Sequence, residues 1–211
     1  MATRNIVLWE VDVQADFMLP GGNLYVPGAE KIIPRVKDLV QAARSSGTFI
    51  VSSGDAHAPN DPEFQTFPAH CVKGTLGAQI LPEGLARDAV TIPNDPATNA
   101  LPPLDGVPQV IFEKQTLDVF DNPRADSLVS SLGKDVEYFV FGVVTEFCVI
   151  RAAKGLLRHG RKVSIIRDAI EQIHAEEGRR ALEELKSLGA EFLSTREAIE
   201  AMAQSARGKA S

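Results

Sequence analysis

The chain alternates short apolar runs with amphipathic segments, and this alternation constrains its fold more than any other feature. Apolar runs predict six β-strands, at residues 6–12, 48–53, 109–114, 138–144, 162–167 and 191–193. Helical patterns cover residues 30–46, 123–132, 146–159, 175–188 and 196–203. Strands that alternate with helices form mostly parallel sheets with right-handed crossovers. We therefore expect an α/β fold, a three-layer α/β/α open parallel sheet in the order 3-2-1-4-5, plus an edge strand.

Length and composition favour one globular domain. The 211 residues are enough for a single core, which we assign to 1–204, with a flexible tail at 205–211. The formal charge of −6 comes without a basic stripe, so nucleic acid is not an expected partner. No apolar run approaches the roughly 20 residues of a membrane span, and none resembles a secretory signal. These features predict a cytoplasmic protein without a membrane partner.

Two cysteines, Cys71 and Cys148, lie far apart in the sequence. A reducing cytoplasm predicts free thiols. A disulfide between them stays open, although nothing in the sequence favours it.

The connection from residue 55 to residue 108 is the irregular part of the chain. It contains nine prolines and little periodicity. A long irregular excursion inside a compact domain usually serves function. We expect this segment to contribute to a site.

Polar residues follow five of the predicted strands: Asp12, Asp55, Lys114, Cys148 and Asp168. Open α/β sheets form their sites at the carboxyl ends of the strands, beside the switch in strand order. In the expected order, the strands before Asp12 and Cys148 are neighbours, and Lys114 reaches in from the third strand. Each residue alone fits a turn cap or a solvated charge. An acid, a cation and a thiol together are the groups of a nucleophilic cysteine hydrolase.

Cys148 comes three residues after Thr145, which is expected to cap the following helix. In a first helical turn, unpaired N–H groups and the helix dipole favour a thiolate. Position alone also fits a buried, inert cysteine. The other strand-end residues favour a reactive thiol at Cys148.

A second group of residues has the character of metal ligands. Asp55 and His57 are separated by one residue, and His70 follows in the same excursion. Carboxylate and imidazole donors suit Zn²⁺, Fe²⁺ or Mn²⁺. Glu63 is a tentative fourth ligand. The spacing is equally consistent with a surface loop that carries incidental histidines.

Four motifs occur in a fixed order along the chain: residues 12–17 with 20–29, 54–57, 70–78 and 142–149. Together they resemble the motifs of nicotinamidases, in the isochorismatase-like cysteine hydrolase superfamily. The resemblance covers about residues 5–195, and four ordered motifs are far more specific than one. It implies an isochorismatase-like hydrolase fold.

The resemblance also implies roles for individual residues. It implies a catalytic triad of Asp12, Lys114 and Cys148, and one divalent metal ion held by Asp55, His57 and His70, with Glu63 at a variable fourth position. It implies a cis peptide between Val143 and Val144, and an oxyanion hole built from the N–H groups of Val144 and Cys148. The expected substrate contacts are Phe17, Phe67, Val144 and Phe147.

The expected activity is that of a cysteine amidohydrolase, which cleaves a small amide through a thioester and has nicotinamide as its first candidate substrate. The chain departs from nicotinamidases at Phe67, where a Trp is common, at Glu146–Phe147, where an Asp-His pair is common, and at Gln115, where Gly usually follows the lysine. Three alternatives stay open: a hydrolase of another small amide or ureido compound, an isochorismatase-type hydrolase, and a catalytically silent metal-binding interaction module. The partner is a small molecule, and homo-oligomers through the apolar side of the helix after Cys148 are left open.

Glu10 is unusual for its position. It shares a face with Asp12 in a strand that we expect to be central. An isolated buried carboxylate is costly. We therefore expect Glu10 to be paired with Arg or Lys, or to stay protonated.

Overall fold

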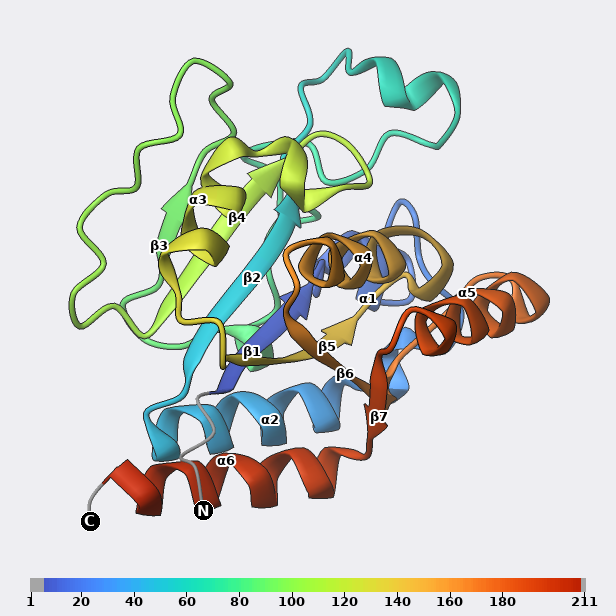
Figure 1. Cartoon of the computed structure of the whole chain (residues 1–211). Helices are drawn as coiled ribbons and strands as arrows, with labels where there is room; N and C mark the ends of the chain where they lie inside the picture. The colour runs from blue at the N-terminus through green and yellow to red at the C-terminus, as the bar shows by residue number, and fades with distance from the viewer. Residues whose placement is uncertain (1–5, 210–211) are drawn as a thin grey trace.

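The computed structural model describes residues 6–209, in which seven parallel strands form one sheet (Figure 1). The strand order is β3-β4-β2-β1-β5-β6-β7. The strands are β1 (Ile6–Val11), β2 (Phe49–Asp55), β3 (Val90–Ile92), β4 (Gln109–Lys114), β5 (Glu137–Gly142), β6 (Lys162–Ile170) and β7 (Glu191–Leu193). The expected order is confirmed from β4 through β6, with β7 as the edge strand. β3 is an additional edge strand that the sequence did not predict.

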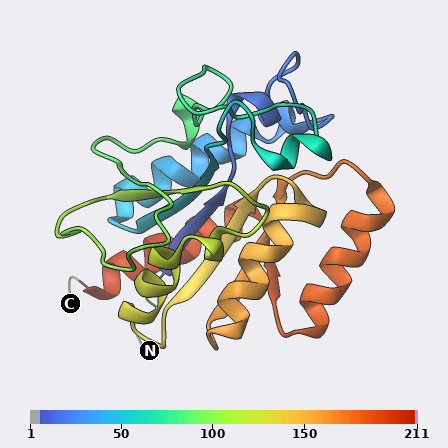
Figure 2. The same ribbon diagram turned by 90° about the horizontal axis from the view of Figure 1, so that it is seen from above.

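Helices cover both faces of the sheet, so the expected three layers are present. α2 (Ile33–Ser46) and α6 (Thr195–Lys209) lie side by side on one face (Figure 1). The other face carries α3 (Pro123–Ser131), α4 (Ile150–Arg158) and α5 (Ala175–Ser187). Seen from above, α4 and α5 lie on the opposite side of the sheet from α2 (Figure 2).

The central strand β1 is buried along its whole length. Val7, Trp9 and Val11 pack on the face of α3 and α4, whereas Ile6 and Leu8 pack on the face of α2 and α6. A parallel strand covered on both faces reads as a continuous apolar run. Burial on both faces explains why β1 was predicted with almost correct bounds.

Helix bounds differ from the prediction at the start of α2 and at the end of α6. The pattern expected from residue 30 is a short 3-10 turn, Ala29–Lys31, followed by α2. The last helix continues to Lys209, so residues 205–209 of the expected tail are helical, and Ser205 is buried. Residues 210–211 lie outside the described part of the chain.

The apolar side of α4 is used inside the fold. Ile150, Ala153 and Leu156 are buried in the core that the sheet shares with α3 and α5. The apolar side of this helix, which the sequence left open as an oligomerisation surface, is therefore covered within the chain. Among the described residues, no helix is long and apolar enough to span a membrane.

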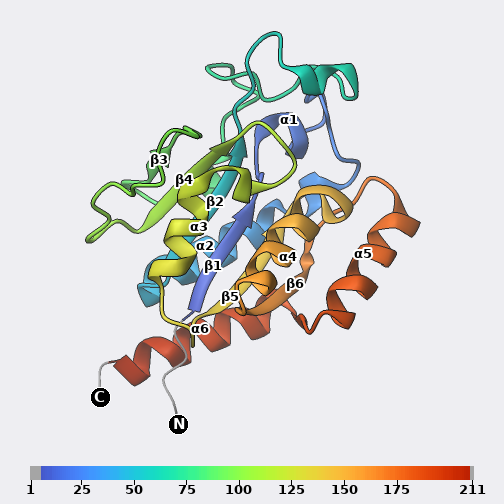
Figure 3. The same cartoon turned by 45° about the horizontal axis from the view of Figure 1, so that its top comes forward.

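The first part of the irregular connection, to about residue 80, rises above the carboxyl ends of the strands (Figure 3). Its last part returns to their amino ends, where the Ile50 N–H donates to the Pro108 carbonyl. The connection contains the 3-10 turns Pro62–Gln65 and Pro82–Gly84, and β3. A short helix after β1, α1 (Ala15–Met18), lies at the same end of the sheet (Figure 3). This arrangement encloses the strand ends that carry the polar residues.

Candidate active site

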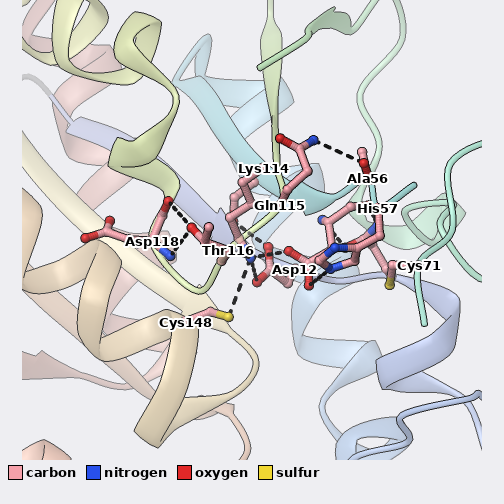
Figure 4. A network of polar contacts seen from close by, with 12 residues as sticks. Asp12, Ala56, His57, Cys71, Lys114, Gln115, Thr116, Asp118 and Cys148 are labelled. Atoms are coloured by element: carbon pink, nitrogen blue, oxygen red, sulfur yellow. Dashed lines mark hydrogen bonds and ion pairs between the residues drawn. The ribbon is translucent and has the colours of Figure 1, made fainter. Parts of the chain in front are cut away.

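Lys114 occupies the centre of the site, at the carboxyl end of β4 (Figure 4). Its Nζ lies 2.9 Å from Asp12 Oδ2 and 3.6 Å from Cys148 Sγ, and it donates to the carbonyl of Thr116 at 3.0 Å. It also forms a short ion pair with Asp55 Oδ1. The structure therefore brings together the three residues that the resemblance implied as a triad.

Two carboxylates compensate the burial of the Lys114 ammonium group. The side chain is 1% exposed, and a buried charge needs close partners of opposite sign. Burial alone would lower the pKa of Lys114, but Asp12 and Asp55 outweigh it and hold this pKa well above its usual value. Lys114 is therefore a fixed cation at the centre of the site.

Asp12 directly follows β1 and has a positive φ of 50°. Its N–H donates to the Ser53 carbonyl at 3.2 Å, and its Oδ1 accepts from the Ser53 hydroxyl at 2.7 Å. Burial and the neighbouring Asp55 raise the pKa of Asp12, while Lys114 opposes the shift. A carboxylate with a raised pKa is a stronger base than an exposed aspartate.

Cys148 lies in a π-helical turn, Thr145–Val149, that leads into α4. The expected cap is wrong, because Val144 occupies the cap position and the Thr145 hydroxyl donates to the Glu171 carbonyl at 2.8 Å. Burial raises the pKa of the Cys148 thiol well above its usual value, and the nearby carboxylates add to this while Lys114 opposes it. The helix start does not produce the resting thiolate that its position suggested, since burial and the carboxylates outweigh it.

The peptide between Val143 and Val144 is cis, as the resemblance implied. Val143 N–H donates to the Val11 carbonyl, and Thr145 N–H to the Glu171 carbonyl. The N–H of Val144 makes no hydrogen bond within the described part of the chain. This N–H is therefore available to a ligand, as an oxyanion hole requires.

Asp55, His57 and His70 are all buried, and each offers a ligand atom within 4.8 Å of the others. Asp55 Oδ2 lies 3.6 Å from His57 Nε2 and 3.5 Å from His70 Nε2. His57 Nε2 has no hydrogen-bond partner in the described structure, which is costly for a buried nitrogen unless a ligand satisfies it. The donor set fits a divalent metal ion.

The Nδ1 atoms of His57 and His70, which point away from the cluster, lie close to oxygen atoms. His70 Nδ1 is 2.7 Å from the Pro68 carbonyl, and His57 Nδ1 is 3.1 Å from Asp61 Oδ2. Such partners leave Nε2 of each ring available to a metal. Glu63, the tentative fourth ligand, is half-buried on the 3-10 turn and is not part of the three-residue cluster.

Aromatic rings surround the metal cluster. The Phe17 ring centroid lies 5.3 Å from that of His70, and the Phe67 centroid lies 5.9 Å from that of Phe147. Phe64, which the sequence analysis did not single out, lies 5.3 Å from His57. The three phenylalanines that we expected to contact substrate are thus gathered around the same space.

The residues that depart from nicotinamidases have separate roles. Glu146 Oε1 accepts from the N–H groups of Ile173 and His174, so it anchors the loop before α5. The Phe147 carbonyl accepts from Arg151 Nη1 at 2.9 Å. The Phe147 ring packs against the ring of Phe67, whereas Glu146 fixes the backbone of the loop before α5.

A pocket of about 460 Å³ lies at the mouth of the site. Its lining includes Glu63, Phe67, Thr116 and Arg151. The Thr116 carbonyl also accepts from Lys114, which joins the pocket to the buried triad. The lining of the mouth thus combines polar and charged side chains with the ring of Phe67.

Asp168 was predicted to follow the fifth strand, but it lies inside β6, which continues to Ile170, and it does not reach this site. Its Oδ2 accepts from Arg35 Nε at 2.9 Å, and its Oδ1 accepts from the Thr195 N–H at 2.7 Å. It therefore joins α2 to the start of α6. Cys71 is also a free thiol, so the disulfide that the sequence left open is absent.

Glu10 has no cationic partner among the described residues. It is fully buried, and its Oε2 accepts from the Ser52 hydroxyl at 2.6 Å and from Gln109 Nε2 at 3.4 Å. Burial raises the pKa of Glu10 to about 8, with Asp12 adding to the shift. Of the two expectations, the protonated carboxyl is the one that the structure supports.

The sequence did not point to three residues that contact the site. Gln14 accepts from the Asp55 N–H, and the Ser53 hydroxyl donates to Asp12. Asp61 lies beside Nδ1 of His57. Gln14 lies within the first motif, so its position was a signal. Ser53 gave no comparable signal because Asp12 lies 41 residues away. Asp61 gave none because a separation of four residues from a histidine is common.

Comparison with known proteins places the chain in a family. The family model for the isochorismatase domain matches residues 7–197. The nicotinamidase/pyrazinamidase of Mycobacterium tuberculosis is 30% identical over 192 residues, 87% of this chain and 95% of that protein. A nicotinamidase of Acinetobacter baylyi is 29% identical over 217 residues, 92% of this chain and 94% of that protein.

A solved structure gives the same result. The pyrazinamidase of Pyrococcus horikoshii in complex with zinc superposes with a TM-score of 0.72 at 31% identity, over 90% of this chain and 99% of that one. The family model covers most of the chain, and the fold and the order of motifs agree with it. This chain therefore belongs to the isochorismatase family.

Proposed function

We propose that this protein is a cysteine amidohydrolase that cleaves a small amide through a thioester on Cys148, with nicotinamide as the first candidate substrate and nicotinate and ammonia as products. One observation carries the proposal. Lys114 Nζ contacts the Asp12 carboxylate at 2.9 Å and the Cys148 sulfur at 3.6 Å, beside a cluster of metal donors. The relatives support amide chemistry, because they are named as nicotinamidases and pyrazinamidases.

Acylation begins from a protonated thiol. The Asp12 carboxylate accepts the Cys148 proton as the sulfur attacks the amide carbonyl carbon, and Lys114 stabilises the thiolate that forms. The N–H groups of Val144 and Cys148 stabilise the oxyanion. Asp12 then returns its proton to the amide nitrogen, the C–N bond breaks, and ammonia leaves.

Deacylation repeats the same proton transfers with water. Asp12 accepts a proton from a water molecule, and the resulting hydroxide attacks the thioester carbonyl. The C–S bond breaks, the acid product leaves, and the Asp12 proton returns to Cys148. The raised pKa of Asp12 suits it to both directions of transfer.

Asp55, His57 and His70 would hold one divalent metal ion, with Zn²⁺, Fe²⁺ and Mn²⁺ as candidates. When bound, the ion supplies a coordination position for a heteroatom of the substrate. Phe17, Phe67 and Phe147 form the aromatic surroundings in which a planar ring is held.

Ammonia release from nicotinamide tests the proposal. The wild type is expected to release ammonia, and the Cys148→Ala and Asp12→Ala variants are expected to lose this activity. The Cys71→Ala variant is the matched control, because Cys71 is a buried free thiol outside the triad. Amide cleavage that survives Cys148→Ala would refute the nucleophile.

A second candidate is hydrolysis of another small amide or ureido compound. The polar mouth favours it, since Arg151, Thr116 and Glu63 offer contacts that a plain pyridine amide does not use. A panel of amides and ureido compounds, assayed with and without a chelator, separates the two candidates. Faster cleavage of a polar amide than of nicotinamide would select the second.

A further inference from the structure

Gln14 has a buried amide group whose hydrogen bonds all reach other segments. Gln14 follows Asp12 by two residues and occupies the N-cap position of α1, its side chain makes no capping hydrogen bond, and the residue is 1% exposed. Its Oε1 accepts from the Asp55 N–H at 2.7 Å, and its Nε2 donates to the Asp55 carbonyl at 2.8 Å. The same Nε2 donates to the Ala78 carbonyl at 2.7 Å. The amide thus holds both backbone groups of Asp55.

These bonds replace a missing strand neighbour. The pairing of β1 with β2 ends at Val11 and Ser53, but β2 continues to Asp55. On its other side β2 stays paired, with Asp55 opposite Lys114 of β4. In a parallel strand the N–H and C=O of one residue point the same way, so those of Asp55 face the place that β1 has left. The Gln14 amide fills that place and satisfies both groups.

The carboxylate of Asp55 is shared between two parts of the site. Oδ1 forms the short ion pair with Lys114, while Oδ2 lies 3.6 Å from His57 Nε2 and 3.5 Å from His70 Nε2. A small rotation of the Asp55 backbone would move both oxygens together. The two hydrogen bonds from the Gln14 amide to the Asp55 backbone, here called the clamp, therefore fix where Oδ1 lies relative to the ammonium group and where Oδ2 lies relative to the histidines.

The third bond of Gln14 ties in the segment that carries His70. The Ala78 carbonyl belongs to this segment, and the Cys71 N–H next to His70 donates to Asp16 Oδ2 at 2.7 Å. One short stretch after β1 thus fixes two of the three metal donors relative to each other.

We propose that Gln14 is a positioning residue, which sets the geometry of the metal site and of the Asp55–Lys114 contact through the backbone of Asp55. The part that concerns turnover rests on the proposed function. The part that concerns metal binding does not depend on which substrate is cleaved.

The test compares Gln14→Met with Gln109→Met. Methionine keeps the length of glutamine and removes its amide. Gln109 is a matched control, since it is fully buried and its amide bonds the Ser52 hydroxyl at 2.7 Å, the Gly84 carbonyl at 2.9 Å and the Ala86 N–H at 2.6 Å. It lies at the opposite end of β4 from Lys114. Both variants lose a buried amide, but only one loses the clamp on Asp55.

The readouts are zinc affinity, measured on metal-stripped protein by competition with a chromophoric chelator, and the visible spectrum of the Co²⁺-loaded protein. Outer-shell partners of metal ligands typically contribute about 10- to 100-fold in affinity. We expect Gln14→Met to weaken zinc binding by about that factor and to change the Co²⁺ spectrum. Gln109→Met is expected to keep the zinc affinity and the Co²⁺ spectrum of the wild type, even where its unfolding temperature falls as far as that of Gln14→Met.

If Gln14→Met does not fold, Gln14→Asn is used, whose amide is one methylene too short to hold both backbone groups. It is expected to give a smaller loss of affinity in the same direction. Zinc affinities of the Gln14 and Gln109 variants that are equal to each other would overturn the proposal. A wild type without amidase activity but with the expected difference in affinity would refute the proposed function and leave the role of Gln14 supported.

Discussion

Lys114 links the two carboxylates and the thiol, so the site depends on this one buried charge. Asp12 and Asp55 are both buried within contact of its Nζ. If the ammonium group is removed, two carboxylates remain in a low-dielectric space with no cation, and breaking such a pair is strongly destabilising.

Lys114→Met is therefore expected to lose about 3–5 kcal/mol of unfolding free energy and at least about 100-fold in turnover. Urea denaturation and ammonia release measure the two effects. Lys73→Met is the control, because Lys73 pairs with Glu113 at the surface and is 59% exposed. Its expected cost is below about 1 kcal/mol. A Lys114→Met protein with wild-type turnover would show that the lysine does not take part.

Glu10 makes the stability of the fold depend on pH. Its pKa is raised by burial from 4.5 to about 8, so the folded state holds a proton that the unfolded state releases between these values. Stability from this group is complete below pH 4.5 and is lost as pH rises to about 8.

Glu10→Gln removes that titration. The unfolding free energy of the wild type relative to the variant is expected to fall by several kcal/mol from pH 4.5 to about 8 and then to level off. Urea denaturation of both proteins from pH 5 to pH 9 measures the difference. A difference that stays constant with pH would mean that Glu10 titrates normally.

At the level of elements, the site depends on how closely β5 approaches β1. Gly142 ends β5 with a positive φ of 115°, and a Cβ there would lie 2.0 Å from the Val11 carbonyl oxygen. Neither strand can move away, because both are buried in the centre of the sheet.

Gly142→Ala is expected to destabilise the protein by more than about 2 kcal/mol, since it combines an unfavourable φ with a backbone clash. Thermal unfolding measures the effect. Gly133→Ala is the control, because a Cβ at Gly133 meets no atom within 4 Å. Equal unfolding temperatures for the two variants would contradict the close packing of β1 and β5.

The sequence predicted the elements whose burial pattern is local. β4 and β7 have the predicted bounds, and the polar strand ends of Asp12 and Lys114 do meet. It did not predict β3, since three residues in a proline-rich segment carry no pattern and are ordered only by pairing with β4. It misplaced the cap at Thr145, because the hydroxyl is taken by Glu171, which lies 26 residues away.

The protonation of Cys148 could not be predicted either. The helix start is a local signal for a thiolate, whereas the raised pKa comes from burial and from carboxylates that other strands supply. Such contributions depend on the complete tertiary structure.

For the whole molecule, the metal donors lie at the end of a central strand and in the connection that follows it. Asp55 ends a central strand, and His57 and His70 are buried in the connection that follows it. Because all three donors are buried in packed segments, we expect the site to fold without the ion.

Metal-stripped protein is therefore expected to keep its far-UV circular dichroism and lose its amidase activity, and added Zn²⁺, Mn²⁺ or Fe²⁺ is expected to restore the activity. A ligand that binds the native state raises the unfolding temperature, so the metal should raise it in the wild type. His70→Ala should not respond. Unfolding on chelation would contradict a preformed site, and full activity after verified metal removal would contradict a role for the ion.

The central claim is that Cys148 carries the acyl group during amide hydrolysis. The direct test is acid quench of the working enzyme with an amide from which it releases ammonia, followed by peptide mapping by mass spectrometry. The account predicts an acyl thioester on the peptide that contains Cys148, and neither an adduct nor turnover in Cys148→Ala. An acyl group on Cys71 instead, or ammonia release by Cys148→Ala at the wild-type rate, would contradict it.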